Sequence, residues 1–407
     1  MKKVVIIGGG AAGFFAANEL LGGCLQNSIS VTILEKSNKI LSKVKVSGGG
    51  RCNVTNSTKE ISKLVACYPR GQKELKKVFK KFATVETINW FQDRGVELKT
   101  EEDGRVFPKS DSSQTIIDCL LQPVKFGILE IVLNAEVKLI EKNNRSFIVK
   151  TESAFFHADY IIVTSGGYYK PQGYSYLKHL GHTIIDPVPS LFTFNIKDHP
   201  LKSLMGVSVK ESKVRIMGTD LQYSGPILIT HWGFSGPAVL KLSAFGALYL
   251  HKAAYKNGIL INWVNARDED EVRAKINECI VQKSTSFPHL TNFYRLPDRL
   301  WKYLLIKSEI ELNKNWSEQG KKSINKLVNA IFLDTYEING KTTFKEEFVT
   351  CGGINLDDVE FETMESKLVT GLYFAGEVLD IDGITGGFNF QAAWSTAWVA
   401  ARSIQNK

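Results

Sequence analysis

Three glycines near the start of the chain have the spacing of a loop that binds a diphosphate. Gly8, Gly10 and Gly13 fill the pattern G-x-G-x-x-G in the stretch KKVVIIGGGAAGFFAANEL. In this pattern the first glycine makes a tight turn, the second lets a pyrophosphate approach the backbone, and the third lets a helix pack on a strand. The chemistry indicated is the binding of an adenine dinucleotide by unpaired amides at the positive end of a helix.

A carboxylate further along strengthens this interpretation. The stretch SVTILEK is predicted as a second buried strand and carries Glu35 at its end. A carboxylate at that place can accept hydrogen bonds from an adenosine ribose and would repel a 2′-phosphate. The pattern predicts an adenine dinucleotide but does not separate NAD from FAD.

A second glycine-rich stretch, KVSGGGRCNVTN, runs from Lys45 to Asn56. Three consecutive glycines weaken helices and strands, because glycine loses more backbone freedom on folding than other residues. A disordered linker is one interpretation, but the embedded Arg-Cys-Asn argues against it. Cys52 has no second cysteine nearby for a disulfide, so a cysteine chosen for its size is a simpler interpretation than a redox partner.

Two later glycine clusters favour FAD. YIIVTSGGYY is predicted as a buried strand that runs into Gly166–Gly167, and GLYFAGEV as another that runs into Gly376–Glu377. Gly386–Gly387 then opens a long C-terminal helix. An NAD dehydrogenase completes its nucleotide fold within one contiguous half, whereas a site closed by the end of the chain suits a larger, flavin-bearing ligand. The start of that helix would favour an anionic reduced flavin, and Glu377 would accept hydrogen bonds from the ribityl chain.

Five stretches together resemble the BaiN/YhiN-type (aminoacetone oxidase-like) flavoproteins of bacteria. They are GGGAAG, KVSGGGRCNVTN, EEDGRVFPKSDSS, THWGFSGPAVLKLS and the C-terminal CGGINLDDVEFETMESKLVTGLYFAGEVLDIDGITGGFNFQAAW, so the resemblance covers nearly the whole chain. It implies an FAD-dependent oxidoreductase with a two-dinucleotide-binding-type fold and an inserted substrate domain. The chain departs from the family at Ser165, where a threonine is usual, and in the short loop YYKPQGYSY, which leaves the substrate open.

The resemblance also implies that the SGGGRCN loop wraps the flavin, with Arg51 and Asn53 as donors. Together the patterns and the resemblance predict a tightly but not covalently bound FAD. The residues expected to bind it are Gly8, Gly10, Ala11, Ala12, Gly13, Glu35, Lys36, Lys43, Ser47, Gly48, Gly49, Gly50, Arg51, Cys52, Asn53, Val137, Ser165, Gly166, Gly167, Gly376, Glu377, Gly386, Gly387, Phe388, Asn389 and Phe390.

The expected fold class is α/β, a Rossmann-like FAD fold of the two-dinucleotide-binding type with an inserted β-barrel-like domain and a helical cap. We expect the FAD domain in residues 1–190 and 346–407, and the substrate or lid domain in 191–345. Within the insertion, 191–263 and about 330–345 would form the β module and 264–329 the helical part. RDEDEVRAKINECIVQKS, RLPDRLWKYLLIKSEIEL and KKSINKLVNAIFLDTYE are predicted as its helices. A lid of this kind would exclude water and select the substrate, although a purely structural insertion is the alternative.

Flavin itself would transfer the hydride. No second complete G-x-G-x-x-G is present, so NADH or NADPH would bind only transiently, in the substrate cleft. Candidate proton donors are His231 in THWGFSG and Asp380 and Asp382 in VLDIDG. A histidine in such a place is more often packed than catalytic, and the aspartates could instead cap their loop.

Charge and cysteine content bound the partners and the compartment. The 51 Lys and Arg exceed the 42 Asp and Glu, and lysines gather in KELKKVFKKF on the face of a predicted helix opposite its apolar residues. A solvated helix face is the plain interpretation, and a surface for RNA the sharper one. Six cysteines without a C-x-x-C pair, and no apolar run of membrane length, predict a cytoplasmic protein with neither a metal site nor a membrane anchor.

Three classes of function remain open. The leading hypothesis is an FAD-dependent oxidoreductase acting on a small organic molecule, either an NAD(P)H-linked reductase of an unsaturated bond or carbonyl, or an amine oxidase that uses O2. The second is a flavoprotein that acts on tRNA, for which no aromatic and basic RNA motif is recognisable. The third is a flavin-binding scaffold without turnover. The oligomeric state is open.

Overall fold

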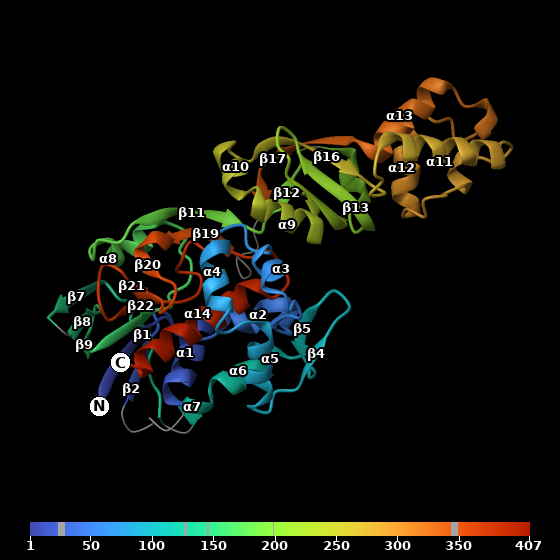
Figure 1. Cartoon of the computed structure of the whole chain (residues 1–407). Helices are drawn as coiled ribbons and strands as arrows, with labels where there is room; N and C mark the ends of the chain where they lie inside the picture. The colour runs from blue at the N-terminus through green and yellow to red at the C-terminus, as the bar shows by residue number, and fades with distance from the viewer. Residues whose placement is uncertain (23–28, 126–127, 145, 198, 343–348) are drawn as a thin grey trace. The chain divides into compact units, whose positions relative to one another are not determined.

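The chain forms two compact units. The computed structural model describes residues 1–22, 29–125, 128–144, 146–197, 199–342 and 349–407. Unit 1 comprises Met1–Ser190 and Lys345–Lys407, and unit 2 comprises Leu191–Phe344. Both ends of the chain therefore belong to unit 1, as the blue and red ribbons of Figure 1 show. The boundary predicted at 345 and 346 lies outside the described residues.

Unit 1 is built on a seven-stranded sheet with the order β20-β21-β22-β10-β1-β2-β6. The five adjacent strands β22, β10, β1, β2 and β6 run parallel to one another, and β20 and β21 add antiparallel pairs at one edge. Continuous apolar runs such as Val4–Ile7 are buried, as expected for parallel strands covered on both faces. The predicted α/β class is thereby confirmed. The strands are β1 (Lys2–Ile7), β2 (Ile29–Leu34), β6 (Glu130–Val132), β10 (Tyr160–Val163), β20 (Val359–Glu360), β21 (Glu365–Ser366) and β22 (Leu372–Phe374).

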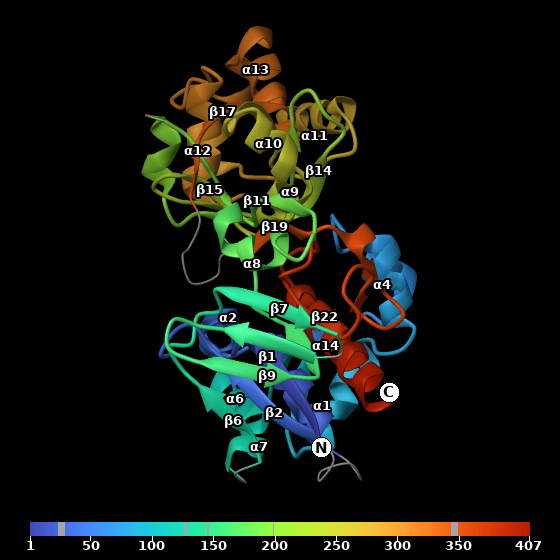
Figure 2. The same cartoon turned by 90° about the vertical axis from the view of Figure 1, so that its left-hand side faces the viewer.

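Helices from the two ends of the chain pack together beside this sheet. The first helix, α1 (Ala11–Leu21), lies against the last, α14 (Phe388–Gln405), and Figures 1 and 2 both show the blue and red helices side by side. An aromatic cluster joins them, because the Phe15 ring lies 5.2 Å from that of Trp394 and 4.3 Å from that of Trp90. The long C-terminal helix predicted from the sequence is therefore present and is part of the core.

The remaining elements of unit 1 are short. Leu75, Val78 and Phe79 of α4 are buried and its lysines are exposed, which confirms the predicted amphipathic helix. The helices are α2 (Ser42–Gly50), α3 (Ile61–Val65), α4 (Gln72–Phe79), α5 (Thr84–Gln92), α6 (Ser113–Leu120), α7 (Gln122–Lys125) and α8 (Ser175–Lys178), with the 3-10 helices η1 (Pro171–Tyr174) and η5 (Leu356–Asp358). Three small sheets pair β3 (Thr55–Asn56), β5 (Arg105–Pro108) and β4 (Leu98–Thr100); β7 (Leu139–Asn143), β8 (Ser146–Lys150) and β9 (Phe155–Ala158); and β11 (Ile184–Ser190) with β19 (Val349–Ile354).

Unit 2 combines an antiparallel sheet with a helical part. The sheet order is β17-β16-β13-β14-β15-β12-β18. Its strands are β12 (Thr193–Asn195), β13 (Ser208–Ile216), β14 (Gln222–Ile229), β15 (Gly233–Ser235), β16 (Lys256–Asn262), β17 (Asp334–Asn339) and β18 (Lys341–Thr342). The helices are α9 (Pro237–Phe245), α10 (Ala247–Lys252), α11 (Glu269–Gln282), α12 (Asp298–Lys307) and α13 (Lys321–Phe332), with η2 (Pro200–Leu204), η3 (Pro288–Leu290) and η4 (Trp316–Glu318).

One predicted helix of unit 2 is wrong at its end. KKSINKLVNAIFLDTYE is helical only to Phe332, and its last residues begin β17. Asp334, Tyr336 and Ile338 are buried in alternation with exposed residues, which is the period of a strand. Asp334 is buried because its carboxylate accepts hydrogen bonds from Trp263 Nε1 (2.9 Å) and Tyr336 OH (2.5 Å) and pairs with Lys307. Contacts with Trp263 and Lys307, which are distant in sequence, thus favour a strand over a helix at Asp334.

No described helix combines the length and the apolar character that a membrane span requires.

We predict that Gly13→Ala destabilises unit 1. A Cβ on Gly13 would lie 2.1 Å from the Gly8 carbonyl oxygen, so α1 would have to move away from β1. Overpacking of this kind costs about 1–3 kcal/mol of the free energy of unfolding, measured by chemical denaturation. Gly10→Ala is the matched control, because nothing lies within 4 Å of a Cβ there. Equal stability of the two variants would contradict this account of the turn.

Candidate functional site

The carboxyl ends of the parallel strands meet at the first glycine turn. Gly8 has a φ of +116°, and a Cβ on it would lie 2.5 Å from the Thr164 carbonyl oxygen at the end of β10. The Thr164 hydroxyl donates to the Gly8 carbonyl at 2.9 Å. Gly10 caps α1, whose first residues are Ala11 and Ala12, and the space beside its Cα is open. The turn therefore packs against the end of β10 at Gly8, whereas its backbone at Gly10 is not covered by other described atoms.

Glu35 holds this turn in place. Its Oε2 accepts a hydrogen bond from Gly9 N at 2.8 Å, and its Oε1 accepts from Ser37 N and Ser37 Oγ at 2.9 and 2.8 Å. Oε1 thus uses both of its lone pairs, whereas Oε2 retains one for a further donor. Lys36 places its ammonium 4.7 Å from the centre of the Tyr168 ring, and Val137 is buried a few residues after β6.

Glu377 gathers a second group of residues that are distant in sequence. Its Oε2 pairs with Lys43 Nζ at 2.6 Å, and its Oε1 accepts from Thr350 N at 3.3 Å. Gly166 has a φ of +74°, and a Cβ on Gly167 would lie 3.2 Å from Glu377 Oε1. The predicted Lys43, Gly166, Gly167 and Glu377 therefore lie together.

Two further predicted residues border this group. Gly376, with a φ of +77°, packs on Ala12, where a Cβ would lie 3.0 Å from the Ala12 Cβ. The Ser165 hydroxyl accepts from Tyr176 OH at 3.3 Å.

Thr350 is a member of this group that the sequence patterns did not single out. Its side chain is 1% exposed, its hydroxyl has no hydrogen-bond partner among the described residues, and a Cβ on Gly167 would lie 2.1 Å from it. The available signal was its place directly before Cys351-Gly352-Gly353.

The SGGGRCN loop adopts a conformation that requires glycine. The α2 helix leaves helical geometry at Ser47, whose ψ is 146°, and Gly48, Gly49 and Gly50 then take φ values of +58°, +70° and +85°. Residues other than glycine rarely adopt this left-handed backbone conformation three times in succession. A Cβ on Gly49 or Gly50 would meet nothing within 4 Å, so this backbone faces open space. The run of glycines is an ordered, bare backbone rather than a linker.

The residues after these glycines interlock with the start of α14. With its amide oriented to suit its neighbours, Asn53 accepts a hydrogen bond from Gly387 N at 2.9 Å and donates to Thr55 O at 2.9 Å. Trp394 Nε1 donates to Val54 O at 2.9 Å, and Asn56 Nδ2 donates to Gly386 O at 3.2 Å. We name this set of contacts between residues 53–56 and 386–394 the interlock. It brings two predicted clusters, far apart in sequence, to one place.

The first residues of α14 are held by their own surroundings. Asn389 accepts from Gly383 N at 2.8 Å and donates to Gly383 O at 2.9 Å, which closes the preceding loop. The Phe388 carbonyl accepts from Tyr68 OH at 2.7 Å, and the Phe390 ring stacks on Trp394 at 5.5 Å. These residues therefore fix the helix start in position.

Arg51 and the two cysteines have the following protein surroundings. Arg51 donates to Glu101 Oε1 at 2.7 Å, and its guanidinium lies 4.0 Å from the centre of the Phe107 ring. Cys52 is fully buried and Cys351 is 1% exposed, and burial raises the pKa of each thiol to about 12. Both cysteines are therefore protonated and shielded, as a role in packing requires.

The three proton-donor candidates have unlike positions. Asp382 is fully buried, accepts from Nε and Nη2 of Arg70 and accepts from Ser190 Oγ at 2.6 Å. Asp380 accepts from Gly352 N at 2.7 Å. Both aspartates thus anchor the loop that precedes α14. His231 belongs to unit 2, where it is exposed in the turn between β14 and β15.

Three stretches of bare backbone belong to unit 1: the glycine turn, the SGGGRCN loop and the start of α14. We use the name cradle for Gly8–Gly13, Gly48–Gly50 and Gly386–Gly387. The space beside Gly10, Gly49 and Gly50 is open, as a ligand that contacts backbone directly would need, and Gly10 and Gly387 are the N-caps of α1 and α14. Over the part of the chain described, no three His, Cys, Asp or Glu side chains gather as a metal site would need. The donor set therefore fits an anionic organic cofactor with hydroxyl groups.

Comparison with known proteins identifies relatives along the whole chain. Residues 2–403 match the family described as HI0933-like protein Rossmann domain. The chain is 28% identical over 418 residues to the 3-dehydro-bile acid delta(4,6)-reductase of Clostridium scindens, covering 100% of both chains. It is 29% identical over 415 residues to the ribosomal RNA dihydrouridine synthase of Haemophilus influenzae, covering 99% of this chain and 98% of that one. The protein of the same name from Escherichia coli is 27% identical over 409 residues, covering 98% and 97%.

We predict that Arg70→Met destabilises the protein more at pH 8 than at pH 5. Burial raises the pKa of Asp382 to about 6, against the opposing effect of Arg70. A carboxyl with a folded pKa above its unfolded value contributes stability below about pH 4 that is lost as the pH rises through 6. Without Arg70 that pKa rises further. The charge is then uncompensated at pH 8, at a cost of about 3–5 kcal/mol, whereas at pH 5 the group is mostly protonated in both proteins.

The control for this comparison is Arg105→Met, which breaks a half-exposed pair with Glu101. Urea denaturation at both pH values should show a loss below about 1 kcal/mol that does not depend on pH. A loss for Arg70→Met that is equal at pH 5 and pH 8 would contradict the assignment of Asp382 as the titrating partner.

Proposed function

The chain belongs to the HI0933-like protein family, and from this membership and the cradle we propose that it is an FAD-dependent reductase. Its reaction would add two hydrogens across a carbon–carbon double bond conjugated with a carbonyl group. The single observation that carries the proposal is the interlock, which joins the residues after Gly48–Gly50 to the start of α14, while α14 packs on the α1 helix that follows the Gly8–Gly13 turn.

Each part of the cradle has a proposed role toward FAD. The α1 N-terminus and Gly10 would take the diphosphate, and Glu35 would accept from the adenosine ribose. Glu377, paired with Lys43, would accept from the ribityl hydroxyls. Gly49 and Gly50 would let backbone amides lie against the ring system.

FAD supplies hydride transfer when bound. The protein's own part is to orient the cofactor and to stabilise charge. The α14 N-terminus carries a partial positive charge, and the interlock fixes it in place, so it would favour negative charge that develops beside it. Of the three proton-donor candidates, His231 alone has an exposed side chain, and we retain it as the one to test.

The relatives support a reductase rather than an oxidase. One is named for the reduction of delta(4,6) double bonds in a 3-dehydro-bile acid, and the other two for making dihydrouridine, which is uridine with two added hydrogens. In both reactions the double bond is conjugated with a carbonyl group. A hydride and a proton would add to the two carbons, and NADH or NADPH is the proposed source of the electrons.

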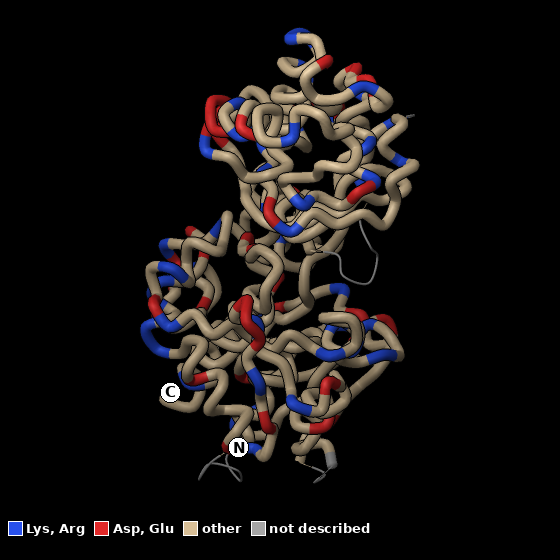
Figure 3. The backbone as a smooth tube through the Cα atoms, turned by 90° about the vertical axis from the view of Figure 1, so that its right-hand side faces the viewer, with Lys and Arg blue, Asp and Glu red and all other residues tan. Residues whose placement is uncertain are grey.

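Reduction of a uridine in RNA is the second candidate. Two relatives with that activity in their names align over 97% or more of their length, and this chain carries a net charge of +9. Figure 3 shows basic residues in both units, interspersed with acidic ones. Phosphate contacts would make RNA affinity fall with salt.

We predict that the purified protein is yellow and that NADH or NADPH bleaches its flavin absorbance under anaerobic conditions. Addition of a steroid enone or of uridine-containing ribosomal RNA to the reduced protein should then restore the flavin absorbance and identify the substrate.

We predict that the Gly10→Val variant retains at least tenfold less FAD than the unchanged protein, because the valine side chain would occupy the approach of the diphosphate. The matched control is Gly320→Val, which lies in open space at the start of α13.

A colourless protein that takes up no FAD would refute the cofactor assignment. A flavin that amines reduce but NADH and NADPH do not would refute the reductase in favour of an oxidase.

A further inference from the structure

Four lysines form a stripe along the exposed side of α4 in unit 1. We name this set the lysine stripe, and its members are Lys73, Lys76, Lys77 and Lys80. Their intervals of three, one and three residues place all four on one side of the helix, over about 10 Å of its axis. All four side chains are exposed, and none of their ammonium groups makes a hydrogen bond or an ion pair with another described residue. The stripe is therefore a row of charges that an anionic partner can approach.

The carboxylates close to the lysine stripe do not neutralise it. Glu362 Oε2 pairs with Lys81 Nζ at 2.7 Å, and this bond holds the pKa of Glu362 below its usual value, with smaller contributions from the charges of Lys77 and Lys80. Glu74 lies in the first turn of α4, about 100° around the helix from Lys73, where a negative charge stabilises the helix N-terminus. Neither carboxylate bonds to a member of the stripe.

The helix that carries the stripe is fixed to the core that positions the start of α14. On the buried side of α4, the Phe79 ring lies 5.6 Å from that of Tyr68, whose hydroxyl donates to the Phe388 carbonyl oxygen at 2.7 Å. Just after α4, the Phe82 ring stacks on that of Trp398 in α14 at 5.3 Å. The stripe therefore belongs to the same unit as the cradle, and its backbone needs no ordering before it binds a partner.

A row of lysines suits the phosphate backbone of a nucleic acid. One strand of a duplex carries a phosphate about every 3.4 Å along the axis, so a stripe of about 10 Å spans about three phosphates. The exposed residues of α4 include no aromatic ring on which a base would stack. The stripe is thus suited to hold a strand by its backbone and not to read its sequence.

A membrane surface is the alternative partner for a helix of this composition. An amphipathic helix that binds a membrane buries its apolar face among the lipids. The apolar residues of α4, which are Leu75, Val78 and Phe79, are instead buried in unit 1. The helix has only charge to offer to a membrane, whereas charge alone is sufficient for contact with a phosphate backbone.

We propose that the lysine stripe binds the phosphate backbone of RNA. The choice of RNA rests on the second candidate function, reduction of a uridine in RNA, which needs a surface that holds the strand. The binding itself involves neither FAD nor turnover. A protein without flavin would therefore leave this binding measurable, and a failure to bind RNA would leave the proposed reductase of small molecules intact.

The test measures RNA binding by the full-length protein. The anisotropy of a fluorescently labelled single-stranded oligouridylate of 12 nucleotides is followed between 50 and 200 mM salt. The stripe variant is Lys73→Gln/Lys76→Gln/Lys77→Gln/Lys80→Gln, in which α4 is kept because glutamine forms helices about as well as lysine. It should bind about tenfold more weakly or worse at 50 mM salt. The slope of log K against log salt should fall by about 2, since each of about three phosphate contacts contributes about 0.7.

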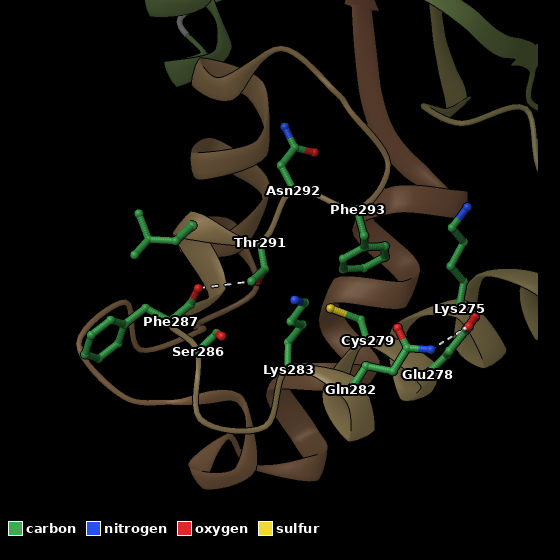
Figure 4. Close-up of a pocket in the computed structure, with 11 residues that line it drawn as sticks. Lys275, Glu278, Cys279, Gln282, Lys283, Ser286, Phe287, Thr291, Asn292 and Phe293 are labelled. Carbon is green, nitrogen blue, oxygen red and sulfur yellow. Dashed lines mark hydrogen bonds between the residues drawn. The ribbon is translucent and has the colours of Figure 1, made fainter.

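Two controls separate the position of the charges from their number. Replacement of the same four lysines by arginine keeps the charge and should keep the affinity within about twofold. The second control removes four exposed lysines of unit 2 and should change the affinity less than about threefold. Two of these lie apart from each other on the wall of a cleft of about 590 Å3, as Figure 4 shows. This control is Lys210→Gln/Lys252→Gln/Lys275→Gln/Lys283→Gln.

A loss of affinity confined to the stripe variant would support the proposal. Equal losses in the stripe variant and the unit 2 control would overturn it, because net charge alone would then account for the binding. It would also be overturned if the unchanged protein failed to bind oligouridylate at 50 mM salt. Vesicles that contain phosphatidylserine are the last probe: binding to them that depends on the stripe, with unchanged binding of oligouridylate in the stripe variant, would assign the stripe to a membrane instead.

Discussion

The interlock between residues 53–56 and the start of α14 is the constraint on which the site of unit 1 depends. Val54, Thr55 and Asn56 bond to residues more than 300 positions later, and Asn53 bonds to Gly387 N. Their backbone can reach α14 because Gly48–Gly50 turn the chain through left-handed geometry. A Cβ on Gly387 would lie 2.5 Å from Thr55 O, so this contact needs glycine at position 387. The bare backbone of the loop is thus a consequence of how unit 1 is closed.

This closure explains how a chain interrupted by a whole unit could still build the proposed FAD site. The parallel strands β1, β10 and β22 bring Gly8, Gly166–Gly167 and Gly376–Glu377 to the same edge of the sheet. The aromatic cluster of Phe15, Trp90 and Trp394 packs α1 on α14 behind that edge. Packing therefore fixes two helix N-termini, and the amides at a helix N-terminus are suited to an anionic cofactor. Side chains such as Glu35 and Glu377 add selectivity to a site made mainly of backbone.

Local pattern was sufficient for the parts of the structure that local physics decides. The glycine turn, the C-terminal helix and the amphipathic α4 follow from spacing and periodicity, and the α/β class and the family follow from the motifs together. Long-range partners decide the rest. Asp334 turns the end of a predicted helix into a strand because Trp263 and Lys307 bury it, and Asp382 is enclosed by Arg70 and Ser190. Arg51 lies against Glu101 and the Phe107 ring, and its predicted role toward FAD stays a prediction. None of these partners is near in sequence, so no periodicity could reveal them.

The most direct test of the central claim is hydrogen exchange of the backbone amides, measured by mass spectrometry before and after addition of FAD. If the three segments form one cradle, FAD should protect residues 8–13, 47–56 and 384–390 together, in a single saturable step with the same affinity. Protection confined to residues 8–13, with unchanged exchange in the other two segments, would contradict the account, because the dinucleotide turn would then bind without the loop and the start of α14.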